Sequence, residues 1–567
     1  MVCLHGWING NNHQSFLDAD FGDVYNFIHH VKDSATENNK SIFAFDTGDL
    51  TQGTGLSDAT PTQGEFIFNI AKKIPYSGLT VGNHELGSEA CVDLIANDFA
   101  PYWQGKFISA NVEYKDPYKK FADKYFNISL PNGQGRIVVL GFLYNLGSAA
   151  ANIKITKVAD TLTKEFMNEA LQDSSDPSEK IRLVVSLCHI ATDSAETEEI
   201  RRSIRSKLPK VPLILLTGHS HMYRTRNYST YSNPPDKYSF AMESAYYLTQ
   251  IGRISVILSD SESVDPIFEY RFINGTKDDI QKAAGFINGT KGDILWETDE
   301  GTEIRKLIKE KYEELRLSEV IGNAPKTFYR NPAYAQIASG QALYSYIVDQ
   351  MMPDHGPYSQ LAIPECNTVD EVITVGVLGP SSVRYDLYEG PVILNDIFTI
   401  DPFNDQLFVF EGVDGVDMQK VMGQDTNQQI KTLQKEFIDY GDKKEISNVT
   451  IDPTKKYEIV ATSYDYKGVQ TALNKVVIGK YSAKETSIGM RQMLIDYVKK
   501  YWSSDIDPQP TEIDPSPTDT SLPGISKSDP DDPYLSSQYS YSGKISIKTS
   551  FIFVYIFIPL LFVTFNV

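Results

Sequence analysis

Five short runs of mainly apolar, β-branched residues recur in the first half of the chain, each followed by polar residues and glycine. Their apolarity is continuous rather than alternating, which is typical of strands buried on both faces of a layered α/β domain. Helix-like stretches such as 24–34 and 161–171 lie between them. We therefore expect a sheet sandwich flanked by helices over about residues 1–258, with strands at 41–45, 79–81, 136–142, 181–187 and 211–216.

The pattern changes after residue 258. Residues 259–298 contain a local duplication, FINGTKDDI and FINGTKGDI, which predicts a surface insertion because two copies are too few for a solenoid. Residues 299–317 form a charged helical stretch with opposite charges four residues apart, either a connecting helix or a solvated surface helix. A second α/β region is expected over 318–502, and a stalk rich in proline and aspartate over 503–543.

The end of the chain is apolar and uncharged from Phe551 to Val567, and small residues and a polar spacer precede it. This arrangement over 544–567 predicts a GPI-attachment signal, with a tail anchor or a single membrane span as the alternative. The opening MVCLHGWING has no signal peptide. Glycosylation sequons nevertheless fit a secreted glycoprotein, and they stand at Asn39, Asn127, Asn227, Asn274, Asn288 and Asn448.

Composition narrows the function. The 53 basic and 74 acidic residues give a net charge of −21, which argues against a protein that binds nucleic acid through a basic surface. This charge does not exclude an enzyme for anionic substrates, because bound cations can reverse the local field. The four cysteines include no CxxC pair, so a cysteine zinc knuckle is excluded.

Candidate metal ligands follow the predicted strands. Ligands in open α/β sheets bind at the carboxyl ends of strands, and these ends offer an aspartate, an asparagine and several histidines to one crevice. Such oxygen and imidazole ligands suit Zn, Mn, Fe or Co, and a carboxylate can bridge two of these ions. The residues are His5, Asp49 in GDLTQG, Asn83 and His84 in GNHE, His189, and His219 and His221 in GHSH.

The order GDxxQG, GNHE, strand-end histidine and GHSH resembles the calcineurin-like metallophosphoesterases. GNHE followed by a second domain resembles their 5'-nucleotidase family, and HGWINGNNHQ resembles a fungal secreted or vacuolar branch. The resemblance implies an α/β fold with a four-layer αββα sandwich and a smaller C-terminal α/β domain. It also implies a hydrolase with two divalent cations that releases phosphate from a small anionic phosphoester such as a nucleotide.

The resemblance assigns Asp49 as the ligand that bridges the two cations, and His84 as the catalytic histidine. The other ligands divide between the two ions, one bound by His5 and His221 and the other by Asn83, His189 and His219. In that family an aspartate three residues after the catalytic histidine supports it. The chain has Gly87 at this position, so another group or water must be the partner of His84.

The second domain would bind the substrate. LGPSSVR resembles the arginine loop of the family and predicts Arg384 as a ligand of the substrate phosphate or carboxylate. Phe403 in TIDPFND would stack on a nucleobase, and the second aromatic plate would be Tyr464 or, alternatively, Tyr466. Substrate would then bind between the two domains, and a hinge near 298–318 would close on it.

The first motif of the family, D-x-H, is incomplete, because Cys3 stands at the position of its aspartate and the apolar strand before it is missing. We expect that translation begins upstream or that an upstream exon is lost; zinc binding by the Cys3 thiolate is the alternative. The leading interpretation is a secretory-pathway enzyme, extracellular or anchored at the cell surface, with the vacuole as an alternative. The competing interpretations are a catalytically impaired surface protein with the same fold and a phosphodiesterase of the same superfamily.

Overall fold

The computed structural model describes residues 3–503 and 551–558, except 12, 15, 39, 260–264, 332–334, 336–338, 355–372, 380–381, 422–444 and 447–450. The chain divides into two compact units. The first comprises Met1–Leu317 with Thr549–Val567, and the second comprises Ser318–Lys548. Most of the predicted stalk and the sequons at Asn39 and Asn448 lie outside the described residues.

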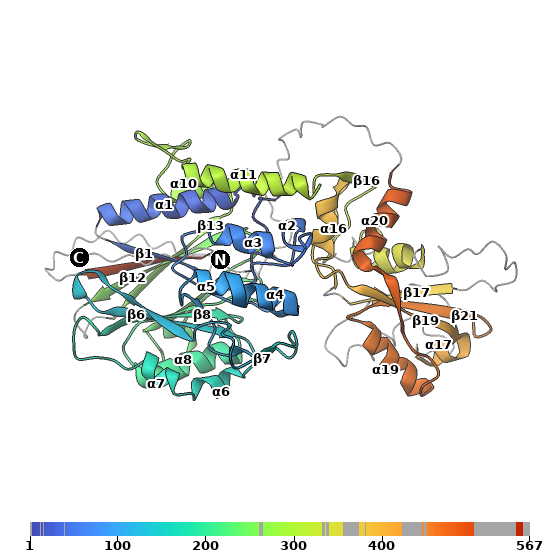
Figure 1. Cartoon of the computed structure of the whole chain (residues 1–567), viewed down its shortest axis with the longest axis horizontal. Helices are drawn as coiled ribbons and strands as arrows, with labels where there is room; N and C mark the ends of the chain where they lie inside the picture. Colours follow the sequence, from blue (N-terminus) through green and yellow to red (C-terminus); the bar gives the residue numbers. More distant parts are fainter. Residues whose placement is uncertain are drawn as a thin grey trace. The chain divides into compact units, whose positions relative to one another are not determined.

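Two six-stranded sheets lie face to face in the first unit (Figure 1). The first sheet has the order β13 (Ile267–Asn274), β12 (Gln250–Ser259), β23 (Phe551–Ile558), β1 (Ser41–Asp46), β2 (Gly78–Thr80), β3 (Phe107–Ile108). The second has the order β10 (Tyr223–Asn227), β11 (Ser239–Ser244), β9 (Leu213–Leu216), β8 (Ile181–His189), β6 (Arg136–Leu143), β5 (Tyr125–Ser129). Two small ribbons, β4 (Val112–Tyr114) with β7 (Ile153–Ile155) and β14 (Thr290–Lys291) with β15 (Ile294–Leu295), complete the strands.

Helices cover the outer face of each sheet and give the αββα layers that the sequence predicts (Figure 1). Beside the first sheet lie α1 (Phe21–Glu37), α2 (Gly55–Asp58), α3 (Glu65–Ala71), η1 (His84–Leu86), α4 (Glu89–Leu94), η2 (Ile95–Phe99), α5 (Ala100–Tyr102), α10 (Lys277–Ala283) and α11 (Asp299–Glu314). Beside the second lie η3 (Pro131–Gly133), α6 (Val158–Leu162), α7 (Phe166–Ala170), α8 (Ala195–Lys207) and α9 (Tyr228–Tyr231). The helix expected over 161–171 is thus two short helices.

The core explains the continuous apolar runs. One face of each sheet contributes to the cluster between the sheets, with Phe45 and Ile254 from the first and Val139 and Val185 from the second. The other face of the second sheet packs against α6, α7 and α8. Strands such as β6 and β8 are therefore buried on both faces, which is why their sequences lack alternation.

Strand β23 lies between β12 and β1, parallel to β1 and antiparallel to β12. The segment at Cys3 lies between the loops that adjoin the same two strands, because its backbone donates to the Gly48 carbonyl and accepts from the Tyr247 amide. Residues 551–558, expected in an anchoring tail, thus occupy the place of the strand predicted to lead into His5. An open gap would leave the backbone groups of β1 and β12 without partners, which is costly in a buried sheet. Among the described residues, none of the helices has the length and apolarity that a membrane crossing requires.

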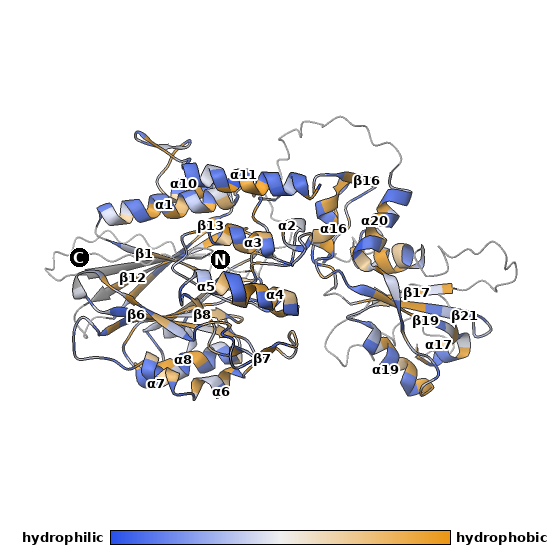
Figure 2. Ribbon diagram, in the orientation of Figure 1, coloured by the Kyte–Doolittle hydropathy of each residue, from blue (hydrophilic) through white to orange (hydrophobic). Residues whose placement is uncertain are grey.

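The insertion and helix α11 both pack on α1. Phe286 and Trp296, from the insertion, are buried, and the Trp296 carbonyl bonds to the ring of His30. His30 is therefore a core residue of this layer. Helix α11 lies along α1, and Arg305 bonds to Asp20 and Asp23. Hydrophilic and hydrophobic residues alternate along α11 (Figure 2), as expected of a helix with one buried face.

The second unit contains a five-stranded sheet and a two-stranded ribbon. The sheet has the order β20 (Glu445–Ile446), β17 (Ile373–Leu378), β21 (Lys456–Thr462), β19 (Gln406–Asp414), β22 (Lys484–Gly489), and the ribbon joins β16 (Val320–Ala324) to β18 (Gly390–Ile393). Its helices include α13 (Leu343–Tyr346), η4 (Ile347–Met351), α14 (Met352–Asp354), α16 (Leu394–Ile400), α17 (Gly415–Val421), α19 (Tyr466–Val476) and α20 (Met490–Tyr501). Apolar clusters cover both faces of the sheet, which gives the second α/β region expected from the sequence.

Candidate metal centre

The predicted ligands meet at the carboxyl ends of the parallel strands. Strand β1 leads to Asp49, β2 to Asn83 and His84, β8 ends at His189, and β9 leads to the two histidines of GHSH. The segment at His5 joins them, because its amide donates to the Asp49 carbonyl at 2.8 Å. The structure therefore brings all seven residues to one edge of the sandwich, as strand-end placement predicts.

Five residues of this edge have left-handed backbone conformations that side chains rarely adopt. The φ angles are 50° at Cys3, 53° at His5, 57° at Asp49, 77° at His219 and 57° at His221. Each such conformation costs about 1–3 kcal/mol and persists only where the surrounding structure imposes it. This concentration of strain at the ligand positions indicates a functional site.

Close contact between two loops explains the glycine of GNHE. A Cβ atom on Gly82 would lie 2.1 Å from Oδ1 of Asp49, so a side chain there would displace the carboxylate. The loop before Asp49 is equally near, since a Cβ on Gly48 would meet the Gly82 amide nitrogen at 2.3 Å. The two glycines therefore allow the strand ends to approach each other around Asp49.

Two groups of ligand atoms converge on Asp49. Within each group all ligand atoms lie within 4.8 Å of one another. In one, Nε2 of His5 lies 3.0 Å from Nε2 of His221 and 3.7 Å from Oδ2 of Asp49. In the other, Nε2 of His189 lies 3.0 Å from Oδ2 of Asp49 and 3.2 Å from Oδ1 of Asn83. The groups are Cys3, His5, Asp49 and His221, and Asp49, His189 and His219.

The ligand atoms around Asp49 are arranged as expected for a cation site, and they satisfy one another poorly by hydrogen bonding. Oδ2 of Asp49 is buried and has no well-aligned hydrogen-bond donor among the described residues, although histidine nitrogens surround it. A buried carboxylate oxygen without a donor is costly unless an ion occupies the space in front of it. The set of imidazole, carboxylate and amide ligands suits Zn, Mn, Fe or Co.

The electrostatics of the site keep Asp49 ionised. Burial raises the pKa of its carboxyl, but His189, His84 and His5 outweigh burial and hold that pKa well below its usual range. Burial lowers the pKa of His189 in turn, but Asp49 outweighs this effect and raises it. An ionised carboxylate at the centre of the site is the state that a bridging metal ligand requires.

Glu85, the last residue of GNHE, holds the loops together. Its buried carboxylate accepts hydrogen bonds from the amides of Asp49 at 2.9 Å, Thr51 at 3.0 Å and Gly82 at 2.8 Å, and from the Thr51 hydroxyl at 3.0 Å. These bonds join the loop after β1 to the loop after β2. This role of Glu85 was not predicted from the sequence, where its place beside His84 was the available signal.

Gln52 is the partner of His84 that the sequence left open. Its side-chain Oε1 lies 2.5 Å from Nδ1 of His84, and its backbone carbonyl lies 3.0 Å from Nδ1 of His5. Gly87, at the position of the family's aspartate, has room for a side chain, since a Cβ there would meet only the His84 carbonyl, at 3.9 Å. A neutral amide therefore contacts Nδ1 of His84, in place of the carboxylate that the family would have at position 87. The only hint of this in the sequence was the glutamine of GDLTQG.

Aromatic rings support the outer histidines. Tyr144 stacks on His219 with ring centroids 4.1 Å apart, and Tyr246 stacks on His221 at 5.1 Å. The Tyr247 ring meets the His5 ring edge-on at 5.5 Å. These contacts restrict the imidazole orientations, and none of the three tyrosines was identified from the sequence.

The second unit brings its predicted residues close together. The guanidinium of Arg384 lies 5.6 Å from the centre of the Phe403 ring. The loop after Phe403 joins the loop before Tyr464, because the Ser463 hydroxyl donates to Asp405 at 2.6 Å. Tyr464 is 56% exposed, whereas Tyr466 stacks on Phe408 with ring centroids 4.1 Å apart. Of the two tyrosines, Tyr464 is therefore the exposed one.

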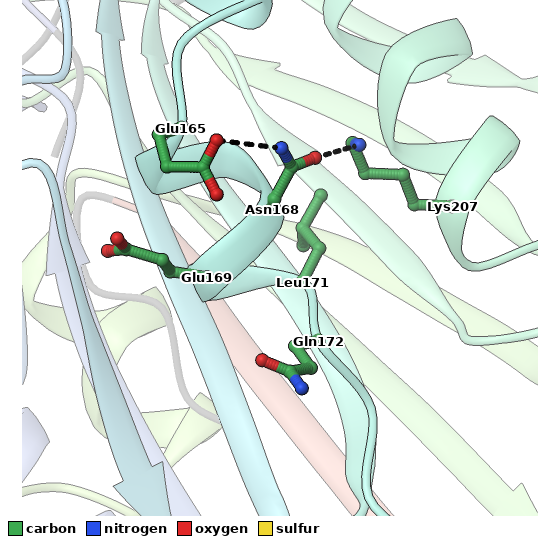
Figure 3. A pocket seen from close by; sticks show the side chains of 6 residues that line it. All are labelled: Glu165, Asn168, Glu169, Leu171, Gln172 and Lys207. Atoms are coloured by element: carbon green, nitrogen blue, oxygen red, sulfur yellow. Dashed lines mark hydrogen bonds between the residues drawn. The ribbon is translucent and has the colours of Figure 1, made fainter.

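A hollow on the helical face of the first unit has a different character (Figure 3). The Asn168 side chain accepts a hydrogen bond from Lys207 and donates one to Glu165. The polar side chains that line the hollow are exposed and come from the α7 region and the end of α8. None of the residues that line it belongs to the two groups of candidate metal ligands.

Comparison with known proteins agrees with this geometry. Residues 3–223 match the calcineurin-like phosphoesterase family. An uncharacterized protein of Schizosaccharomyces pombe is 27% identical over 423 residues, which are 70% of this chain and 67% of that one. A secreted protein of Arthroderma benhamiae is 22% identical over 442 residues, 71% of this chain and 63% of that one. The matched region thus spans about two thirds of these curated relatives.

Solved structures match most of the chain. The 5'-nucleotidase of Candida albicans superposes with a TM-score of 0.72 at 20% identity, covering 88% of this chain and 97% of that one. The 5'-nucleotidase precursor of Thermus thermophilus superposes with a TM-score of 0.55 at 13% identity, covering 88% and 96%. Residues 3–223 therefore resemble the calcineurin-like phosphoesterases, and the chain as a whole has a fold like that of the 5'-nucleotidases.

Proposed function

We propose that this protein is a dinuclear, metal-dependent phosphoester hydrolase that releases phosphate from nucleotides or related phosphoesters. The observation that carries the proposal is the convergence of two ligand groups on Oδ2 of Asp49, a buried oxygen without a well-aligned donor among the described residues. Nucleotidase neighbours with the same fold support the substrate class.

The residues at the strand ends would hold two divalent cations. Asp49 would bridge them, with His5 and His221 on one ion and Asn83, His189 and His219 on the other. When bound, such cations neutralise phosphate charge and lower the pKa of a bound water to near neutrality. The ligand set favours Zn, Mn, Fe or Co over Mg.

His84 would act on the phosphoester directly. Its Nδ1 bonds to Gln52, and Nε2 is the ring nitrogen that would act on the substrate. A protonated imidazole at that position would stabilise charge that develops on the phosphoryl oxygens or would protonate the leaving oxygen. Gln52 would fix the direction of the ring without changing its charge.

The second unit would supply specificity. The Arg384 guanidinium would bind a phosphate or carboxylate, and the rings of Phe403 and Tyr464 would stack on a nucleobase. The exposed ring of Tyr464 beside the loop of Phe403 supports this assignment. Loss of nucleotide preference in Tyr464→Ala, with unchanged turnover of a generic aryl phosphate, is the expected result.

We also propose that the protein passes through the secretory pathway. The four sequons within the described residues are all exposed, at Asn127, Asn227, Asn274 and Asn288, and one relative is a secreted protein. Treatment with an endoglycosidase should lower the apparent mass of protein isolated from its native host. Release by a phosphatidylinositol-specific phospholipase would separate a GPI anchor from other forms of attachment.

One panel tests the hydrolase. Phosphate release is measured from AMP, a UDP-sugar, a cyclic nucleotide and an aryl phosphate, with and without added Mn²⁺ or Zn²⁺. His84→Asn should leave the metal content unchanged and lower kcat by about 10²–10⁴-fold. Preference for the cyclic nucleotide would identify a phosphodiesterase. Absence of metal-dependent turnover on every substrate would refute the proposal and favour a surface protein that retains only the fold.

A further inference from the structure

Cys3 belongs to the first group of ligand atoms. Its Sγ lies within 4.8 Å of the ligand atoms of His5, Asp49 and His221, and its side chain is fully buried. A buried cysteine is often a small apolar core residue. Cys3 does pack in the apolar cluster between the sheets, and its sulfur in addition lies where two imidazoles and a carboxylate converge.

The backbone holds the sulfur in this position. The Cys3 amide donates to the Gly48 carbonyl at 3.2 Å, and its carbonyl accepts from the Tyr247 amide at 3.1 Å. The conformation at Cys3 is left-handed, with φ of 50°, as it is at His5, Asp49 and His221. Cys3 therefore shares the strained geometry of the candidate ligands.

A hydrogen bond to the sulfur provides a second, independent observation. The backbone amide of His219 donates to Sγ of Cys3 at 3.2 Å. Sulfur can accept such a hydrogen bond, and the bond fixes the position of the Cys3 sulfur beside the other ligand atoms. The donor comes from GHSH, so the loop that supplies His219 and His221 also orients the sulfur.

The other buried thiols among the described residues of the first unit belong to neither group of ligand atoms. Burial raises the pKa of both Cys91 and Cys188, which keeps them as neutral thiols. The Cys188 sulfur pairs only with the Ser186 hydroxyl among the described residues, on the face of β8 that packs against helices. Cys188 is therefore a matched control that is buried in the same domain and directed away from the ligands.

We propose that the Cys3 thiolate is a ligand of the cation bound by His5 and His221. This inference deepens the proposed function, because it concerns one of its two cation sites. Binding would release the thiol proton to solvent and form a sulfur–metal bond. A site with one thiolate, two imidazoles and one carboxylate favours Zn²⁺ or Co²⁺ over Mn²⁺ and Mg²⁺, which prefer oxygen ligands.

Cobalt substitution tests the ligand without any substrate. The full chain is stripped with a chelator and reloaded with Co²⁺, and metal content and absorption spectra are recorded. We expect two ions per chain and a thiolate-to-cobalt charge-transfer band in the near ultraviolet. The band should persist in Cys188→Ala and disappear in Cys3→Ser and Cys3→Asp. Cys3→Asp should still bind two ions and should prefer Mn²⁺ more than the parent does.

The loss of zinc affinity in Cys3→Ser measures how much the sulfur contributes to cation binding. Cys3→Ser should weaken Zn²⁺ binding at one site by more than the 10–100-fold that typically follows loss of a hydrogen-bond partner of a ligand. Circular dichroism of each variant checks that it is folded. If Cys3→Ser does not fold, Cys3→Asp still tests the position, because it keeps a ligand there. A parent protein that binds no cobalt, or that binds two ions without the band, overturns the inference.

The two proposals fail in different ways. Turnover of phosphoesters with two bound ions and no charge-transfer band would remove the thiolate and leave the hydrolase intact. A charge-transfer band in a protein that hydrolyses none of the substrates would support the thiolate ligand and refute the hydrolase.

Discussion

The hydrogen bond between Gln52 and His84 makes a quantitative test of the site possible. Gln52 has φ of 68°, a conformation that asparagine tolerates better than most residues, so Gln52→Asn is the appropriate change. Asparagine is shorter by one methylene, which withdraws the amide oxygen by about 1.5 Å and breaks the 2.5 Å contact with Nδ1 of His84. The backbone carbonyl that bonds to His5 is retained.

The expected loss follows from the bond. A net hydrogen bond is worth about 0.5–1.5 kcal/mol, or up to about tenfold in rate, and misplacement of the ring raises the loss towards about 10²-fold. We therefore expect kcat to fall by about 10–100-fold in Gln52→Asn, with KM and metal content little changed. The loss should be smaller than that of His84→Asn, which removes the imidazole itself.

A compensating change makes the test specific. Gly87 has an ordinary backbone conformation, with φ of −76°, and room for a side chain. Gln52→Asn combined with Gly87→Asp should therefore regain a large part of kcat, because a carboxylate three residues after His84 can take over the bond to Nδ1. Steady-state kinetics on the preferred substrate and elemental analysis provide the measurements. Full activity of Gln52→Asn, or loss of a cation from it, would refute the positioning role.

Three further changes test other parts of the structure. Asp49→Asn should lose at least one cation by elemental analysis, because a neutral amide bridges two ions poorly. Glu85→Ala should lower the free energy of unfolding by about 3 kcal/mol or more in denaturant titrations, since three buried amides lose their acceptor. Burial raises the pKa of Glu458 from 4.5 to about 7. The folded state therefore holds this proton more tightly, and stability should fall by at most about 3 kcal/mol as pH rises from 4.5 through 7. Glu458→Gln should abolish this fall.

Strand-end chemistry was predictable because it depends on local patterns. A buried strand is a continuous apolar run, and the polar residue that ends it must lie at the edge of the sheet, so the positions of Asp49, Asn83 and His189 followed directly. The order of the motifs along the chain allowed us to predict that separate loops converge on Asp49. The exposed position of Tyr464, against the stacked position of Tyr466, could not be distinguished, since the two residues are neighbours in one short segment.

Contacts between distant segments were not predictable. His30 is a polar residue on an amphipathic helix, and the return of the chain at Trp296 covers it. The partner of His84 depends on the left-handed conformation at Gln52, which places an amide across two loops. The pairing of β23 with β1 joins segments that are about 500 residues apart, and no local pattern encodes it. These features depend on tertiary packing that overrides local preference.

The long-range contacts of the candidate ligand residues also suggest when the site forms during folding. Residues 3–6 bond to residues 48–50, and the amide of His219 bonds to the sulfur of Cys3 across more than 200 positions of sequence. We expect such long-range contacts to form late, after the sheets that hold the loops have assembled. Cations would then enter an almost finished protein instead of nucleating its folding. We expect that the ions exchange with the medium without global unfolding, so the compartment in which the protein completes its folding would determine which metal it carries.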